Sequence, residues 1–137
     1  MSSSAKAGVN ETQSPLIFLV DDEPLICELL NLALTQAGYR VRVFTDPMSA
    51  LEAFEDADPK PDCLATDYTM PIFDGLELIR RCLNISPKVR TLLFSGNLKL
   101  EMLNFQAVVK PERFMHKPFV PGQFVEEVRS LLASPAP

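Results

Sequence analysis

Two hydrophobic patterns alternate along the 137 residues of this chain. Runs of about five mostly apolar residues are typical of strands covered on both faces of a sheet, whereas apolar residues spaced three and four apart are typical of helices that bury one side. The pattern predicts strands at 16–20, 40–44, 62–66, 91–95 and 113–117, and helices at 25–38, 46–57, 74–84, 98–109 and 121–133. Each predicted strand is thus followed by a predicted helix.

Residues at the helix ends support these boundaries. Asp46 is a suitable N-cap with Pro47 at the first helical position, and Gly38 is a suitable stop for the preceding helix. Strands that alternate with helices predict an α/β fold with a parallel sheet covered on both faces, and right-handed crossovers favour the doubly wound form. Ligands bind to such sheets at the carboxyl ends of the strands, so the residues at these ends are the candidates for function.

The composition is that of an ordinary globular domain, with 47% hydrophobic and 23% charged residues. A net charge of −5 argues against nucleic acid as a direct partner. No apolar run approaches the roughly 20 residues that a membrane helix needs, and the polar N-terminus lacks a signal-peptide core. We therefore expect a cytoplasmic protein without a membrane partner, with a flexible tail at 1–14, one domain at 15–133 and a frayed end at 134–137.

Polar residues follow four of the five predicted strands. They are Asp21 and Asp22 after the first strand, Asp67 after the third, Ser95 at the end of the fourth and Lys117 at the end of the fifth. Three carboxylates at one edge of a sheet would repel one another, and Mg²⁺ would relieve this because it accepts a few carboxylate oxygens and keeps several waters. Together with an ammonium group and a hydroxyl, the set is suited to hold a phosphoryl group, with Asp67 as the nucleophile.

Each of these residues has a simpler explanation when it is taken alone. Asp22 suits the first turn of a helix, Asp67 suits a turn, and Lys117 suits a solvated surface. The prediction of a phosphoryl site therefore rests on their joint occurrence at successive strand ends.

The motifs at these ends occur in a characteristic order: Asp-Asp at 21–22, Asp-x-x-Met-Pro-x-x-x-Gly at 67–75, Ser-Gly at 95–96 and Lys-Pro-Phe at 117–119. Over residues 15–133 the chain resembles the receiver domain of two-component response regulators. The resemblance implies a flavodoxin-like fold in which a five-stranded parallel sheet has the order 2-1-3-4-5 and carries five helices.

The resemblance also implies a metal site. Asp67 would be the phosphoacceptor and a Mg²⁺ ligand. Asp22 would bind Mg²⁺ directly, Asp21 would bind it mainly through water, and the backbone carbonyl of Thr69 would be a further ligand.

Three more residues match positions that respond to phosphorylation in this family. Lys117, joined to Pro118 by a cis peptide bond, would contact the phosphoryl group. Ser95 would donate its hydroxyl to a phosphoryl oxygen and move toward it, and Phe114 would be an aromatic switch residue. One departure affects this switch, because Lys110 and Pro111 replace the usual Gly-Ala pair before the fifth strand, and the loop there should be reshaped.

The implied partners are a histidine kinase or a histidine phosphotransfer protein as the phosphodonor, and an output partner or a second copy of the chain on the 98–133 face. The protein would be a signalling domain that assists its own phosphorylation and dephosphorylation. On a helix at 98–109, one apolar stripe would pack on the sheet and a second would be exposed for docking; the alternative is an irregular segment that buries both. The first stripe is Leu98, Met102, Phe105 and Val109, and the second is Leu100, Leu103 and Ala107.

Three other functions compete with phosphoacceptance. A haloacid-dehalogenase-like phosphatase would place its nucleophile on the first strand, in an Asp-x-Asp arrangement that this chain lacks. A flavodoxin-like cofactor binder would need a phosphate-binding loop where this chain has the acidic segment Asp-Asp-Glu-Pro at 21–24. A degenerate receiver that acts only as a binding module would not need the complete set of site residues. The three cysteines and the single histidine, His116, are expected to be buried structural residues.

Overall fold

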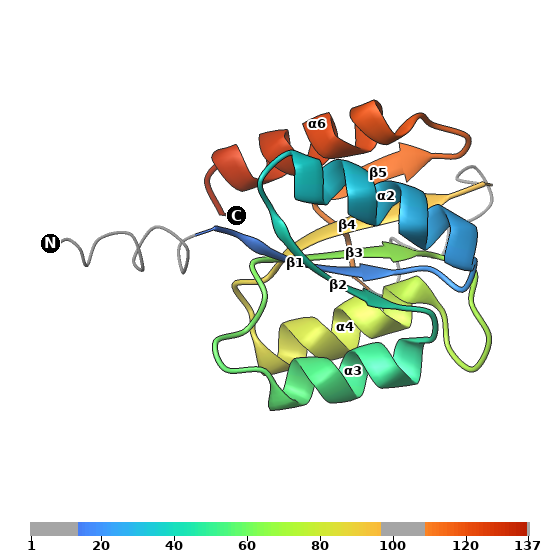
Figure 1. The fold of residues 1–137 in the computed structure, drawn as a ribbon. Coiled ribbons are helices and arrows are strands. Elements are labelled where there is room, and N and C mark those ends of the chain that lie inside the picture. Colours follow the sequence, from blue (N-terminus) through green and yellow to red (C-terminus); the bar gives the residue numbers. More distant parts are fainter. Residues whose placement is uncertain (1–13, 97–108, 137) are drawn as a thin grey trace, which may run out of the picture.

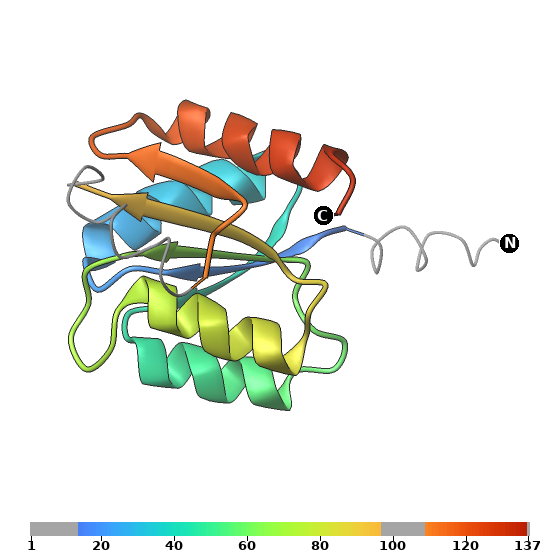
Figure 2. The ribbon, with the colours of Figure 1, turned by 180° about the vertical axis from the view of Figure 1, so that it is seen from behind.

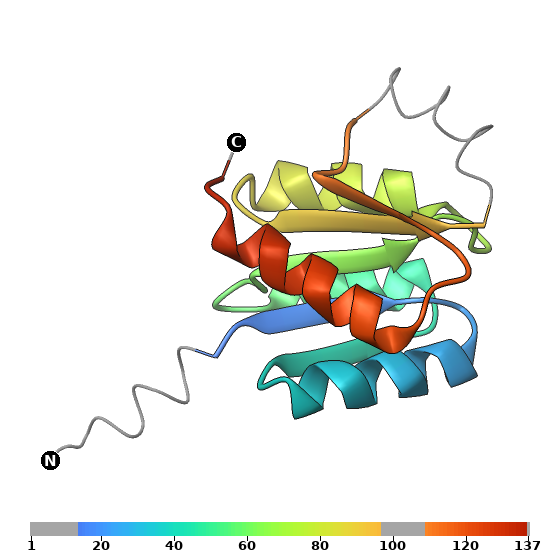
Figure 3. The same ribbon diagram turned by 90° about the horizontal axis from the view of Figure 1, so that it is seen from above.

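The computed structural model describes residues 14–96 and 109–136. Its centre is a five-stranded parallel sheet with the strand order β2-β1-β3-β4-β5, which confirms the predicted fold (Figure 1). The strands are β1 (Leu16–Val20), β2 (Arg40–Phe44), β3 (Cys63–Asp67), β4 (Arg90–Ser95) and β5 (Arg113–His116). Because all five strands run in the same direction, their carboxyl ends lie at one edge of the sheet (Figure 3).

The described residues form four helices, two on each face of the sheet (Figures 1 and 2). They are α2 (Pro24–Gln36), α3 (Pro47–Asp56), α4 (Gly75–Ile85) and α6 (Pro121–Ala133). Helices α2 and α6 cover one face, and α3 and α4 cover the other, so each face has its own apolar cluster. None of these helices is long and apolar enough to span a membrane.

The residues predicted to begin and end the helices do so in the structure. Asp46 caps α3, because its carboxylate accepts a hydrogen bond from the backbone N–H of Ser49 at 2.8 Å. Gly38 follows α2 with a φ of +100°, a conformation that glycine adopts without steric strain. The predicted helix over 98–109 falls almost wholly on residues 97–108, outside the described residues. The predicted tail at 1–14 also lies outside them, except for residue 14. Of the two stripes of that helix only Val109 is described, and it packs against the cluster on the α3 and α4 face.

Two predictions about the side chains have different outcomes. The cysteines Cys27, Cys63 and Cys82 are buried, as expected, and burial raises the pKa of each thiol to between about 11 and about 12. The prediction that His116 is buried is wrong, because β5 is an edge strand and His116 is exposed at its end. Its Nε2 lies 3.2 Å from the carbonyl oxygen of Gly96.

Arg90 is a buried cation that the hydrophobic pattern did not reveal. Its guanidinium makes hydrogen bonds to both carboxylate oxygens of Glu112, the shortest at 2.8 Å. It also donates to the carbonyl oxygens of Ser134 and Pro135, at 2.9 and 3.2 Å. Arg90 therefore connects the start of β4, the residue before β5 and the segment after α6.

We expect Arg90→Met to lower the free energy of unfolding by about 2 kcal/mol, because Glu112 would keep its charge in a mostly buried place without a partner. The matched control is Arg113→Met, which breaks the more exposed Arg113–Glu127 pair and should change the free energy by less than about 0.5 kcal/mol. Urea denaturation followed by circular dichroism measures both. Equal losses in the two variants would contradict the difference that we assign to burial.

Candidate functional site

Carboxylates and one ammonium group meet at the carboxyl ends of β1, β3 and β5. Asp21 follows β1, Asp67 is the last residue of β3, and Lys117 follows β5. The Nζ atom of Lys117 lies 3.3 Å from Oδ1 of Asp67 and 3.4 Å from Oδ2 of Asp21. Asp22 completes an acidic cluster, since one carboxylate oxygen from each of Asp21, Asp22 and Asp67 lies within 4.8 Å of the others. The structure thus brings together four of the predicted site residues.

Asp21 is fixed at the centre of this arrangement. It is fully buried, and its Oδ1 accepts a hydrogen bond from the backbone N–H of Glu23 at 2.9 Å. The thiol of Cys27 donates to the backbone carbonyl of Asp21 at 3.2 Å, and the backbone N–H of Asp21 donates to Phe44 at 3.1 Å. Asp22, by contrast, is exposed at the opening of the site.

The segment after Asp67 folds back on the strand end. The backbone N–H of Tyr68 donates to Phe94 on β4 at 2.9 Å, and that of Gly75 donates to the carbonyl of Tyr68 at 2.8 Å. A Cβ atom on Gly75 would lie only 2.1 Å from the carbonyl oxygen of Asp67, so only glycine fits at this position. The N-cap of α4 is Asp74, whose carboxylate accepts from the backbone N–H of Glu77 at 2.8 Å. The turn residues after Asp67 therefore fix the position of its backbone.

Burial and charge repulsion both raise the pKa of the buried carboxyl groups. Desolvation, followed by repulsion from Asp21, raises the pKa of Asp67 to about 6, although Lys117 opposes the shift. Burial also raises the pKa of Asp21. Burial alone would lower the pKa of Lys117, but attraction to Asp67 and Asp21 outweighs it, so the pKa is raised and the ammonium group stays charged. The site holds more negative charge than Lys117 balances.

Ser95 and Lys117 are linked through the ends of neighbouring strands. The backbone N–H of Lys117 donates to the carbonyl of Ser95 at 2.8 Å, and the side chain of Ser95 is buried at the end of β4. The Lys117–Pro118 peptide bond is cis, as the resemblance implied.

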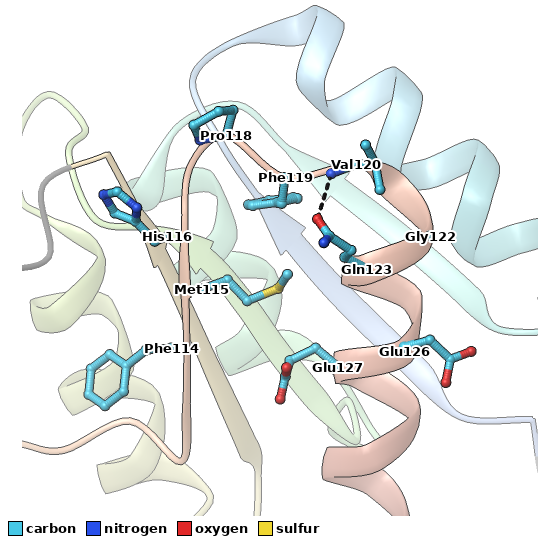
Figure 4. Close-up of a pocket in the computed structure, with 10 residues that line it drawn as sticks. All are labelled: Phe114, Met115, His116, Pro118, Phe119, Val120, Gly122, Gln123, Glu126 and Glu127. Carbon is cyan, nitrogen blue, oxygen red and sulfur yellow. Dashed lines mark hydrogen bonds between the residues drawn. The ribbon is translucent and has the colours of Figure 1, made fainter.

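The two remaining predicted residues are Thr69 and Phe114. Thr69 is exposed, two residues after Asp67. Phe114 is half-buried on β5 and packs against the cluster on the α3 and α4 face, whereas Met115 points to the other side of the strand (Figure 4). Glu23 was missed as a site residue, although its Oε1 lies 3.6 Å from Nζ of Lys117. The acidic run at 21–23 was the available signal, but only its first two members were predicted to be site residues.

The acidic cluster fits a hard divalent cation. Its donor atoms are all carboxylate oxygens, they are close together, and two of the residues, Asp21 and Asp67, are buried with a raised pKa. Mg²⁺ prefers oxygen ligands of this kind and is usually held by one or two carboxylates. The residues present are thus suited to Mg²⁺.

A separate hollow of the described surface lies between β5 and α6. It has a volume of about 750 Å³ and is lined by residues of β5, the following loop and the first turns of α6 (Figure 4). Glu126 and Glu127 lie on one side of it and Phe114 and Met115 on the other. Because none of the acidic cluster residues lines this hollow, it is a second surface feature, separate from the acidic cluster.

The family model and two of the most similar relatives point to the same family of proteins. The family described as "Response regulator receiver domain" matches residues 17–129. The chain is 32% identical over 120 residues to the transcriptional regulatory protein TrcR of Mycobacterium tuberculosis, covering 87% of this chain and 46% of TrcR. It is 30% identical over 116 residues to the response regulator receiver protein CpdR of Brucella abortus, covering 85% of this chain and 95% of CpdR. The chain thus spans about half of TrcR and nearly all of CpdR.

Solved structures share the fold. The receiver domain of HemR from Leptospira biflexa, in its non-phosphorylated form, superposes with a TM-score of 0.79 at 22% identity, over 90% of this chain and 98% of the other. A response regulator receiver protein from Sinorhizobium medicae superposes with a TM-score of 0.78 at 26% identity, with the same coverage of 90% and 98%.

Proposed function

Because the chain belongs to the response regulator receiver family, we propose that it accepts a phosphoryl group on Asp67 from a histidine kinase or a histidine phosphotransfer protein. One observation carries the choice of Asp67: it is the carboxylate at the end of a central strand, 3.3 Å from Lys117 and within 4.8 Å of Asp21 and Asp22. The family match gives no support to the phosphatase or the flavodoxin-like alternative. The complete set of site residues favours phosphoacceptance over a degenerate receiver that only binds.

We assign Mg²⁺ to Asp21, Asp22, Asp67 and the backbone carbonyl of Thr69. When bound, the ion neutralises the charge that the carboxylates gather and stabilises the phosphoryl oxygens during transfer. Oδ1 of Asp21 accepts from Glu23, and Oδ2 lies 3.4 Å from Lys117. Asp22, at the exposed opening, is therefore the better direct ligand.

In the transfer, a carboxylate oxygen of Asp67 forms a bond to phosphorus while the bond between phosphorus and the histidine nitrogen breaks. The electron pair of the broken bond returns to that nitrogen, and the product is an aspartyl phosphate. Lys117 supplies a fixed positive charge beside the new phosphoryl group, and the hydroxyl of Ser95 donates to one of its oxygens. With a pKa of about 6 in the metal-free protein, Asp67 is mostly ionised at neutral pH and so can act as the nucleophile.

Phosphorylation then changes a surface on the α6 side of the sheet. Ser95 is the last residue of β4, and Lys117 is the first residue after β5. Within this strand pair, Phe114 of β5 is the partner of Leu93 of β4. A movement of Ser95 toward the phosphoryl group would thus act on the strand pair that carries Phe114. The hollow between β5 and α6 lies within the described part of the 98–133 face, and we assign it to an output partner or a second copy of the chain (Figure 4).

The proposal is tested with acetyl phosphate, a small phosphodonor, and intact-protein mass spectrometry. The protein should gain the mass of one phosphoryl group when Mg²⁺ is present and none when EDTA removes it. A failure to gain mass with Mg²⁺, or an equal gain in EDTA, would show that the acidic cluster does not work as proposed.

The metal assignment gives a separate prediction about two neighbouring residues. We expect Asp22→Asn to weaken Mg²⁺ binding by roughly tenfold or more, and Asp21→Asn to weaken it less, because a direct ligand contributes more than one that acts through water. Isothermal titration calorimetry of both variants measures the difference. The reverse order, or no loss in either variant, would overturn the assignment of Asp22 as the main ligand.

A further inference from the structure

Ile72 has an unfavourable backbone conformation and an exposed apolar side chain. Among the described residues it is the one non-glycine residue with a positive φ, at +78°. A β-branched residue in this region is strained, whereas glycine or asparagine adopts it more easily. The side chain is 76% exposed, the largest value for any large hydrophobic side chain in the described part of the chain.

The contacts that shape this loop do not need isoleucine at position 72. The backbone N–H of Phe73 donates to Pro71 at 2.9 Å, and that of Gly75 donates to Tyr68 at 2.8 Å. The ring of Phe73 packs against the core on the α3 and α4 face, with the guanidinium of Arg81 4.3 Å from its centre. Isoleucine at 72 is thus less favourable for the folded protein than glycine or asparagine would be. A strained residue without an intramolecular benefit indicates a function outside the fold.

Ile72 lies on one of the segments that form the acidic cluster. Its loop leads from Asp67 to α4, at the carboxyl edge of the sheet (Figure 1). The next most exposed large hydrophobic side chains are Leu25, at 73%, and Val120, at 59%. They follow β1 and β5, the strands whose ends supply Asp21 and Lys117. Exposed apolar side chains therefore occur on all three segments that carry the acidic cluster and its lysine.

We propose that Ile72 is a docking and specificity residue for the protein that delivers the phosphoryl group, an inference that rests on the proposed function. Asp67 is only 6% exposed, so a phosphohistidine on a folded donor reaches it only if the donor covers this edge of the sheet. The donor then contacts the loop that follows Asp67. An apolar patch on the donor, beside its phosphohistidine, packs on Ile72 and removes its side chain from water.

The test compares Ile72→Asn with Ile85→Asn. Ile85 is a second exposed isoleucine, at 38%, but it ends α4 at the opposite edge of the sheet. The donor is an autophosphorylated histidine-kinase core, chosen because it phosphorylates the unmodified chain. We expect Ile72→Asn to lower kcat/KM for this donor by roughly tenfold, mainly through KM, as the loss of one buried aliphatic contact does. Ile85→Asn should leave kcat/KM unchanged.

Two further readouts distinguish docking from damage to the acceptor site. Phosphorylation of Ile72→Asn by acetyl phosphate should be unchanged, and its thermal midpoint should be equal or higher because the backbone strain is relieved. Ile72→Gly, which also tolerates a positive φ, should behave in the same way.

Three results would overturn the inference. They are an unchanged kcat/KM for the kinase core, an equal loss with acetyl phosphate, and a loss confined to self-association in sedimentation. The last would assign Ile72 to contact with a second copy of the chain. If the unmodified chain itself took no phosphoryl group from acetyl phosphate, the proposed function would fail instead.

Discussion

Alanine in place of Gly75 should destabilise the protein by about 3 kcal/mol or more, the largest loss of stability that we expect from a single methyl group. The added Cβ would lie 2.1 Å from the carbonyl oxygen of Asp67 and 3.0 Å from Cδ1 of Leu93. The first contact is with backbone, which cannot move aside as the end of a flexible side chain can. The start of α4 or the end of β3 must therefore shift, and the phosphorylation rate of Asp67 should fall as well.

Gly122 provides the matched control, because a Cβ atom there meets nothing within 4 Å. Gly122→Ala lies in the first turn of α6 and should be neutral or stabilising by up to about 1 kcal/mol. Urea denaturation followed by circular dichroism measures both variants. A loss of stability in Gly75→Ala no larger than that in Gly122→Ala would contradict the close approach of α4 to the end of β3.

Asparagine at position 67 should stabilise the metal-free protein by about 1 to 2 kcal/mol at about pH 8, while abolishing phosphorylation. The pKa of Asp67 is about 6 in the folded protein, against 3.8 for an unperturbed aspartate. The ionised carboxylate therefore favours the unfolded chain. The resulting loss of folding stability, the ionisation penalty, is absent below pH 3.8, grows as the pH rises toward 6, and is complete above pH 6. The variant removes the penalty because asparagine is neutral at every pH.

The measurement is urea denaturation in EDTA at two values of pH. The penalty is nearly absent at about pH 4 and complete at about pH 8. The gain in stability from Asp67→Asn should appear at the higher pH and nearly vanish at the lower one. Glu52→Gln, which removes an exposed carboxylate from the middle of α3, should give no such difference. Adding Mg²⁺ should stabilise the unmodified protein more than the Asp67→Asn variant. A gain that is equal at both values of pH would contradict the electrostatic explanation.

The sequence predicted the fold well because its signals are local and agree with one another. The apolar runs, together with the alternating segment at 40–44 and the short segment at 113–117, predicted the strand ends to within one residue. The cap at Asp46 and the stop at Gly38 agreed with the observed helix ends. The strand ends then placed Asp21, Asp67 and Lys117 at one edge, since parallel strands share their direction.

Features that depend on long-range packing were not predictable in this way. Arg90 resembles a surface residue in sequence, and its burial requires Glu112 and the segment after α6, which are distant along the chain. His116 was expected to be buried because the pattern of β5 does not show that it is an edge strand. The positive φ of Ile72 has no sequence signal, since isoleucine rarely adopts it.

The central claim is that Asp67 carries the phosphoryl group as an acyl phosphate. The most direct measurement treats the protein with acetyl phosphate and Mg²⁺ and then with borohydride, which reduces an aspartyl phosphate to homoserine and releases phosphate. Peptide mass spectrometry should find homoserine in place of Asp67, and only in the phosphorylated sample. Homoserine at Asp21 or Asp22, or a phosphoryl group that remains on Ser95 or His116 after reduction, would contradict the claim.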